Sequence, residues 1–354
     1  MTKVAILNDT HCGTRNSSDI FLDNAEKFYN DVFFPYLLEH DISHIIHLGD
    51  YYDNRKFINF RALNRNRHHF LKPLRDHGIT MDIIRGNHDT FYKNTGELNS
   101  LKELLGHYMN EVTIIQEPKV MTYGSLKIGL VPWMDDENEK QCLEFLANAK
   151  CDWIGGHFDI VGYEMLSGIK CEHGLDRSVF KRFEQVLSGH FHTKSSQDNI
   201  TYLGSQMEMN WSDAHNNKFF HVIDTETREL TEVRNPHTLF HRIYYDDSKQ
   251  DYMYYNLDDV VDKFVKVVVI NKSDTFTFDR LIDRIQNHSI LELKIAENFN
   301  EFLGDNVDDE DISVEDTSVL LDSYIDAVDT DLDKTRIKVQ MNDLMTEAQA
   351  LEIA

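Results

Sequence analysis

The feature that most constrains this chain is a pattern repeated at the ends of its predicted strands. Five short β-rich runs are each followed by a polar motif of aspartate, histidine or asparagine, often beside glycine. The motifs are Asp9-Thr10-His11, Gly49-Asp50, Gly86-Asn87-His88-Asp89, Gly156-His157 and Gly189-His190-Phe191-His192. In an open α/β sheet, ligand-binding and catalytic groups gather at the carboxyl ends of the strands. The pattern therefore predicts an α/β fold with one polar site built from several strands.

The strands that carry these motifs alternate with helical segments in the first half of the chain. Strands are predicted for residues 3–8, 43–48, 80–84, 112–115, 126–131, 152–156, 185–188, 201–203 and 219–223. A helix is predicted for residues 21–38. Such alternation is typical of an α/β domain, and the closer spacing of the later strands indicates mixed sheets.

A second, smaller pattern begins after Pro236. Residues 264–270 and 290–295 predict strands, and residues 278–286 between them predict a helix. We therefore expect a main domain at 1–236, a small α+β domain at 237–300, an acidic linker at 301–317 and a helical segment at 318–354. Two short amphipathic helices in the last segment cannot form their own core, so we expect them to dock on another surface.

The charge of the chain is unevenly distributed. The net charge is −25, which by itself argues against a nucleic-acid partner, but residues 301–354 hold 16 acidic against 3 basic side chains. Residues 54–75 hold seven Lys or Arg and no acidic residue. A local positive stretch can attract phosphates even on an acidic protein, although it is equally compatible with an ordinary solvated helix face.

Other features of the sequence argue against several classes of protein and of structural site. No run of 18 apolar residues is present, which argues against a transmembrane helix, and the N-terminus has no apolar signal-peptide core, so we expect a cytoplasmic protein. The four cysteines form no C-x-x-C pair, which argues against a disulfide framework or a zinc ribbon. The three tryptophans, Trp133, Trp153 and Trp211, are predicted to be packing residues.

The polar motifs contain the ligand types of a metal centre. Each motif alone is weak, because a single histidine is more often a surface or core residue than a ligand. Five in succession, each after a β-run, predict metal binding, and oxygen and imidazole ligands suit Mn²⁺, Fe²⁺ or Zn²⁺. Seven candidate ligands are too many for one ion and fit two ions that share a carboxylate. They are Asp9, His11, Asp50, Asn87, His157, His190 and His192.

This motif set resembles that of the calcineurin-like metallophosphoesterases, over roughly residues 1–235. The resemblance implies a four-layer α/β/β/α sandwich of two mixed sheets. It implies that one ion is bound by Asp9, His11, Asp50 and His192, and the other by Asp50, Asn87, His157 and His190. His88 would protonate the leaving oxygen of a phosphodiester. Asp53 and Asp89 are predicted to orient ligand histidines.

Within this superfamily the chain resembles the SbcD-type recombination nucleases, and among them the T-even-like phage versions. GNHD follows the third strand, where phosphoprotein phosphatases favour GNHE, and a basic stretch follows the second motif. The small α+β domain and the helical pair match the capping domain and ATPase-binding segment of these nucleases. Asp53 is a departure: many cellular relatives have a histidine there that is linked to exonuclease action, so its role stays open.

The resemblance implies a DNA nuclease subunit of a recombination and repair complex. It would be a 3′–5′ exonuclease on duplex DNA and an endonuclease on single strands, with two divalent ions, expected to be Mn²⁺, and an SbcC-type coiled-coil ATPase as partner. If the chain is phage-encoded, it would act in the host cytoplasm. A phosphoprotein or cyclic-nucleotide phosphoesterase would share the motifs but leave the C-terminal segments unexplained. A scaffold without catalysis is disfavoured by the intact ligand set.

The resemblance also implies three contact surfaces. DNA would be contacted by Arg55, Lys56, Arg61, Arg65 and Arg67. A homodimer would form through Phe60, Leu63, Leu98, Leu101, Leu104 and Leu105, unless these side chains pack inside their own domain. The ATPase would be bound by Leu320, Leu321, Tyr324, Ile325, Ile337 and Leu344, unless the helices fold back onto the main domain.

Overall fold

The computed structural model describes residues 3–297 except 109, 167, 168 and 172, and near the C-terminus only 325, 334, 336–338 and 340–341. The chain divides into two units, Met1–Glu297 and Asn298–Ala354. The predicted linker and most of the predicted C-terminal helices lie outside the described residues, as do Leu320, Leu321, Tyr324 and Leu344. In the part of the chain that is described, no helix is long and apolar enough to cross a membrane.

The first large sheet has the strand order β14-β13-β1-β2-β3-β4. Its strands are β1 (Lys3–Leu7), β2 (His44–His47), β3 (Thr80–Ile84), β4 (Val112–Ile115), β13 (Lys218–Asp224) and β14 (Leu230–Asn235). Strands β1 to β4 are parallel, β13 is antiparallel to β1, and β14 is antiparallel to β13. The sheet is therefore mixed, with the parallel strands carrying the first three polar motifs at their carboxyl ends.

The second large sheet has the strand order β11-β12-β10-β7-β6-β5. Its strands are β5 (Lys119–Tyr123), β6 (Leu126–Val131), β7 (Trp153–His157), β10 (Gln185–Gly189), β11 (Ser195–Gln197) and β12 (Ile200–Tyr202). Strands β6, β7, β10 and β12 are parallel, and antiparallel β5 and β11 close the two edges. A short hairpin, β8 (Glu164–Leu166) and β9 (Ile169–Lys170), lies between β7 and β10 in the sequence.

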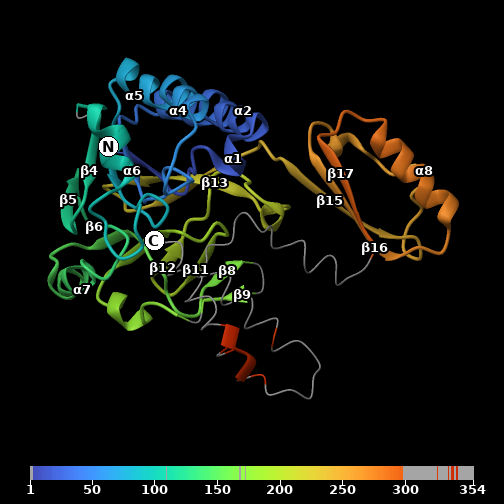
Figure 1. Cartoon of the computed structure of the whole chain (residues 1–354). Helices are drawn as coiled ribbons and strands as arrows, with labels where there is room; N and C mark the ends of the chain where they lie inside the picture. The colour runs from blue at the N-terminus through green and yellow to red at the C-terminus, as the bar shows by residue number, and fades with distance from the viewer. Residues whose placement is uncertain are drawn as a thin grey trace. The chain divides into compact units, whose positions relative to one another are not determined.

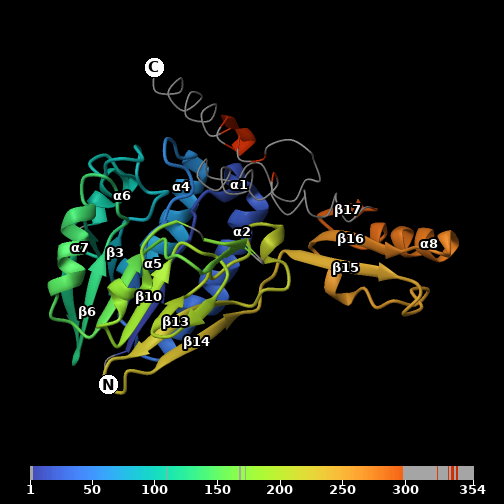
Figure 2. The same cartoon turned by 90° about the horizontal axis from the view of Figure 1, so that it is seen from below.

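The two sheets pack face to face with helices on their outer faces, which confirms the predicted four-layer sandwich (Figures 1 and 2). Strand β1 shows why, because its side chains alternate between two cores. Val4 and Ile6 face the core between the sheets, whereas Ala5 and Leu7 face the core beneath the helices. A strand buried on both faces must be apolar along its buried length, as Val4–Leu7 of β1 are.

The helices that cover the sheets are short. They are α2 (Asp19–Lys27), α3 (Phe34–Glu39), α4 (Phe60–Asn66), α5 (Lys72–His77), α6 (Ser100–Leu105) and α7 (Glu139–Asn148). A π-helical turn, Phe28–Phe33, joins α2 to α3, so the helix predicted at 21–38 has three parts. A similar turn, Arg67–Leu71, joins α4 to α5. The segment labelled α1 (Thr14–Ser17) is a left-handed turn in which Arg15, Asn16 and Ser17 all have positive φ.

A small domain begins after β14. It has a parallel sheet in the order β15-β16-β17, with β15 at Phe240–Asp246, β16 at Phe264–Asn271 and β17 at Glu292–Ala296. Helix α8 (Thr275–Gln286) connects β16 to β17, and its Phe278, Leu281 and Ile285 form a core with the strands. The side chain of Asp274 caps α8 by accepting a hydrogen bond from the Phe276 N–H at 3.0 Å. The predicted strand-helix-strand order is confirmed, but β15 was not predicted.

Candidate metal centre

The predicted ligands lie at the carboxyl ends of strands from both large sheets. Asp9 and His11 follow β1, Asp50 follows β2, and Asn87 follows β3. From the second sheet, His157 is the last residue of β7, and the two histidines 190 and 192 follow β10. The packing of the sheets brings these ends together, so residues far apart in the sequence share one site.

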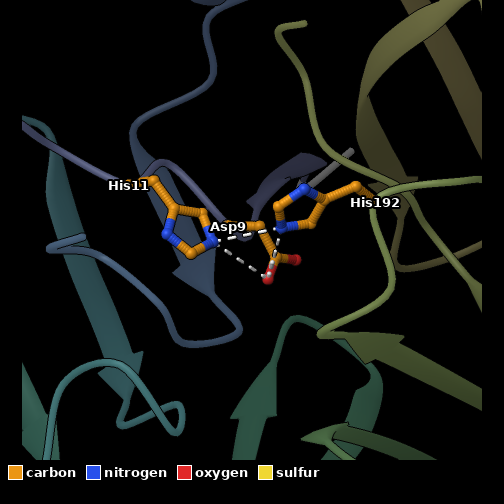
Figure 3. A group of neighbouring side chains, drawn as sticks. All are labelled: Asp9, His11 and His192. Atoms are coloured by element: carbon orange, nitrogen blue, oxygen red, sulfur yellow. Dashed lines mark hydrogen bonds and ion pairs between the residues drawn. The ribbon is translucent and has the colours of Figure 1, made fainter. Parts of the chain in front are cut away.

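The first group of ligands is Asp9, His11 and His192 (Figure 3). The Nε2 atoms of His11 and His192 lie 3.1 Å apart, and each lies 3.9 Å from Oδ1 of Asp9. The Asp9 carboxylate is fully buried and also accepts the backbone N–H of His190 at 3.0 Å. Two imidazole nitrogens and a carboxylate oxygen thus converge on one point, as expected for ligands of a divalent cation.

The second group contains Asp50, His157 and His190, with Asn87 beside them. Nε2 of His157 lies 3.2 Å from Oδ2 of Asp50 and 3.0 Å from Oδ1 of Asn87. The same Asp50 oxygen lies 3.7 Å from Nε2 of His11 in the first group. Asp50 is therefore placed between the two groups, where one carboxylate can serve two ions.

The charges of the site favour cations. Burial acts to lower the pKa of His11, but the carboxylates of Asp53, Asp50 and Asp9 outweigh it and raise that pKa to about 10. Burial acts to raise the pKa of Asp50, but His157, His88 and His11 hold it well below its usual range. The imidazole of His11 is thus protonated at neutral pH without metal, and a divalent ion would replace that proton.

The backbone is strained at four of the ligands. Asp9, His11, Asp50 and His190 have φ values of 47°, 41°, 55° and 87°, a region that side chains with a Cβ rarely adopt. Each such residue costs about 1–3 kcal/mol and persists only where its surroundings fix it. Backbone hydrogen bonds do so here: Asp9 donates to the Gly49 carbonyl at 2.9 Å, and His11 donates to the Asp50 carbonyl at 3.1 Å.

Asp89 holds the loop that carries Asp50. Its buried carboxylate accepts the backbone N–H groups of Asp50, Tyr51, Tyr52 and Gly86 at 2.9–3.2 Å. The prediction that Asp89 orients a ligand histidine therefore needs correction. In the described part of the chain, its hydrogen bonds fix the backbone of the loop that carries Asp50, the ligand placed between the two groups. Gly86 allows the same close packing, because a Cβ there would lie 2.1 Å from Oδ1 of Asp50.

The sequence matches a known protein family over its first 194 residues and a known protein along nearly its whole length. Residues 2–194 match the calcineurin-like phosphoesterase family. The chain belongs to this family. It is also 30% identical to exonuclease subunit 1 of Enterobacteria phage T4 over 98% of this chain and 99% of that protein. A solved archaeal phosphodiesterase covers 66% of this chain and 100% of its own at 16% identity and a TM-score of 0.33, a likeness too slight to support a conclusion.

Membership of this family makes the chain a metal-dependent phosphodiesterase, and the two ligand groups are its candidate metal sites. His88 borders both groups. Its Nδ1 lies 2.6 Å from the Asp53 carbonyl oxygen, and its ring meets the His11 ring edge-on at 4.8 Å. Burial lowers the pKa of His88, so the neutral ring donates Nδ1–H to the carbonyl oxygen of Asp53 and has its lone pair on Nε2.

Asp53 lies beside a ligand of the first group, and its role in orienting that histidine stays a prediction. Its Oδ1 lies 3.2 Å from Nδ1 of His11, whose Nε2 points at the metal ligands. A carboxylate behind a metal-binding histidine fixes its ring orientation and its tautomer. This contact gives a physical reason for an aspartate at position 53.

Two further residues lie near the metal centre, and one of them, Asp159, was not predicted from the sequence. Trp133, predicted to be a packing residue, packs its ring 5.2 Å from that of His190 and 5.9 Å from that of His157. Asp159 lies 2.8 Å from Nε2 of His190. The only signal for Asp159 was its position two residues after His157, which is too weak to use alone.

The basic stretch of this phosphoesterase is not an isolated positive patch. Arg61 pairs with Asp19 at 2.9 Å, and Arg65 pairs with Asp19, Asp23 and Glu26. All three acidic residues belong to α2, which the window 54–75 does not include. The local charge of +7 counted from the sequence is therefore partly neutralised by the neighbouring helix.

The residues predicted for the dimer surface separate into two sets. Leu63, Leu101 and Leu105 are buried in the core beneath the helices, so the prediction that they form a surface is wrong. Phe60 is 85% exposed and Leu98 38% exposed, whereas Leu104 is partly buried against that core. The sequence could not separate these sets, because a short amphipathic helix shows the same spacing whichever surface it covers.

Proposed function

We propose that the chain is the Mn²⁺-dependent nuclease subunit of a DNA recombination and repair complex. It would degrade duplex DNA as a 3′–5′ exonuclease and cut single strands as an endonuclease, within the cytoplasm of a host cell. The observation that carries the proposal is the placement of Asp50 between two ligand groups. Support for DNA as substrate comes from the T4 relative, an exonuclease subunit that aligns along nearly the whole chain.

Each ligand group would hold one ion. Asp9, His11, Asp50 and His192 would hold the first, and Asp50, Asn87, His157 and His190 the second. When bound, two divalent cations supply charge neutralisation and Lewis acidity for phosphodiester hydrolysis. Nε2 of His88 would first take up a proton and then give it to the leaving oxygen, because the neutral ring carries its only proton on Nδ1, where the Asp53 carbonyl holds it.

DNA would be bound beside this centre by Arg55, Lys56 and Arg67. Lys56 and Arg67 are exposed, and Nη1 of Arg55 is buried without a hydrogen-bond partner in the described part of the chain. A buried guanidinium N–H without an acceptor is costly, so a phosphate oxygen would stabilise it. Arg61 and Arg65 would contribute less, because α2 already pairs them.

A homodimer would form through the exposed apolar residues that remain at this surface, Phe60 and Leu98, with Leu104 at its margin. Phe57, 66% exposed, would extend the patch. The partner ATPase would bind the segment after residue 317, in which Ile325 and Ile337 are among the few described residues. The support for an ATPase partner is the resemblance to SbcD-type nucleases and the T4 relative's description as a subunit.

The proposed substrate is tested by comparing three phosphoesters. The purified protein is incubated with labelled duplex DNA, a phosphopeptide or a cyclic nucleotide, each with Mn²⁺ or Mg²⁺. We expect Mn²⁺-dependent cleavage of DNA, stimulated by the ATPase. Preferential hydrolysis of the phosphopeptide or the cyclic nucleotide would contradict the proposed nuclease activity. It would not contradict the proposed metal centre.

A further inference from the structure

We infer that Asp159 is a positioning residue that fixes the ring of His190 for the second metal ion. Oδ1 of Asp159 lies 2.8 Å from Nε2 of His190. A carboxylate at that distance accepts the ring N–H, which places the lone pair of the neutral imidazole on Nδ1. His190 would therefore bind metal through Nδ1.

The neighbouring ligand has the opposite arrangement. Nδ1 of His157 lies 2.8 Å from the carbonyl oxygen of Leu48 and donates its proton there, so the lone pair of His157 is on Nε2. That atom is the one that faces Asp50 and Asn87. The two histidines of the second group are thus fixed by different acceptors, a main-chain carbonyl for His157 and a side-chain carboxylate for His190.

Asp159 is itself well anchored. Its carbonyl oxygen accepts the N–H of Leu175 at 2.9 Å, and a Cβ at Gly174 would lie 2.5 Å from that oxygen. Gly174 has a φ of 113°, so only glycine suits this close approach. The Trp133 ring also packs against the His190 ring, with 5.2 Å between the ring centroids. The hydrogen bond and the ring contact together leave His190 little freedom to turn.

Removing a residue that orients a metal-binding histidine costs about 10–100-fold in metal affinity. We call the Mn²⁺ binding event that His190→Gln weakens the second event, and we expect Asp159→Leu to weaken it by about that factor and to leave the other event nearly unchanged. Asp159→Asn keeps an oxygen acceptor and loses only the charge, so its loss should be smaller. An effect on general stability would weaken both events together.

The test is a Mn²⁺ titration of the full chain, followed by the EPR signal of free Mn²⁺. Asp198→Asn is the matched control, because Asp198 is exposed in the same domain. The double variant Asp159→Leu/His190→Gln should bind the second ion no more weakly than His190→Gln alone, since both changes act through one ligand. Thermal unfolding of the metal-free variants shows whether they fold.

Several outcomes overturn the inference. These are an unchanged second binding event in Asp159→Leu, equal weakening of both events, or fully additive losses in the double variant. Complete loss of the second ion in Asp159→Asn would make Asp159 a ligand instead. The inference rests on the proposed two-ion site. The wild-type titration distinguishes failure of that site from failure of the inference, because wild-type protein that does not bind two Mn²⁺ ions contradicts the site itself.

Discussion

The metal-binding edge and the small domain are stabilised in different ways. At the metal-binding edge the buried and half-buried residues are polar, four of the ligands have strained backbones, and hydrogen bonds such as those to Asp89 hold the loops. In the small domain the buried residues are mainly apolar, with α8 packed on a three-stranded sheet. Substitutions at the edge should therefore alter metal binding and chemistry, whereas substitutions in the small domain should alter stability.

The largest effect is expected for Asp50→Ala. This change removes the carboxylate that both ligand groups share, so neither ion would be held and hydrolysis should fall to background. The measurement is DNA cleavage in Mn²⁺, with thermal unfolding as the check of the fold. Asp136→Ala, at an exposed position of the same domain, is the control and should retain activity. Normal cleavage by Asp50→Ala would show that the carboxylate of Asp50 is not needed for metal binding or hydrolysis.

The next effect is expected for His88→Asn. Loss of proton transfer should lower the rate by about 10²–10⁴-fold while both Mn²⁺ ions still bind. Turnover at saturating Mn²⁺, measured beside an EPR titration, separates rate from binding. His68→Asn, at an exposed position, should behave as wild type. An unchanged turnover number would remove His88 from the mechanism.

The small domain should respond in the opposite way. Leu281 is fully buried in α8, and Leu281→Ala should destabilise this domain by about 2–5 kcal/mol through lost burial and a cavity. Hydrogen exchange of the small-domain amides measures this loss. Phe276→Ala, at a position of the same helix that is 63% exposed, should cost much less. Weaker Mn²⁺ binding in Leu281→Ala would show that the two regions are not independent.

The smallest effect concerns pH and a histidine away from the metal-binding edge. Burial lowers the pKa of His221 on β13 to about 4, below its ordinary value of 6.5. The unfolded chain therefore binds a proton that the folded chain does not, and the stability present above pH 6.5 is lost as the pH falls toward 4. The loss by pH 5 is about 1–2 kcal/mol.

His221→Phe tests this pH dependence, because both ring nitrogens of His221 lack hydrogen-bond partners in the described part of the chain. Urea unfolding of wild type and variant is compared at pH 5 and pH 7.5. The variant should lose less stability on acidification than the wild type. Equal losses in the two proteins would assign the acid sensitivity to other groups.

Much of the fold, and the grouping of the candidate ligands, could be predicted because both depend on strands and strand-end motifs that the local sequence encodes. Apolar runs such as that of β1 must be buried, and motifs after them must lie at strand ends. The edge strands β5, β11 and β14 were missed, because their half-exposed sequences lack a continuous apolar run. The pairing of Arg65 with α2 and the contact of Asp159 with His190 are tertiary, and nothing in the local sequence encodes them.

The central claim is that two divalent ions bind at the edge where the two large sheets meet and share Asp50. Crystals grown with Mn²⁺ and measured at the manganese absorption edge test it most directly. We predict two anomalous peaks with the Asp50 carboxylate between them, one beside His11 and His192 and one beside His157 and Asn87. A single peak, or two peaks of which one or neither contacts Asp50, would contradict the account.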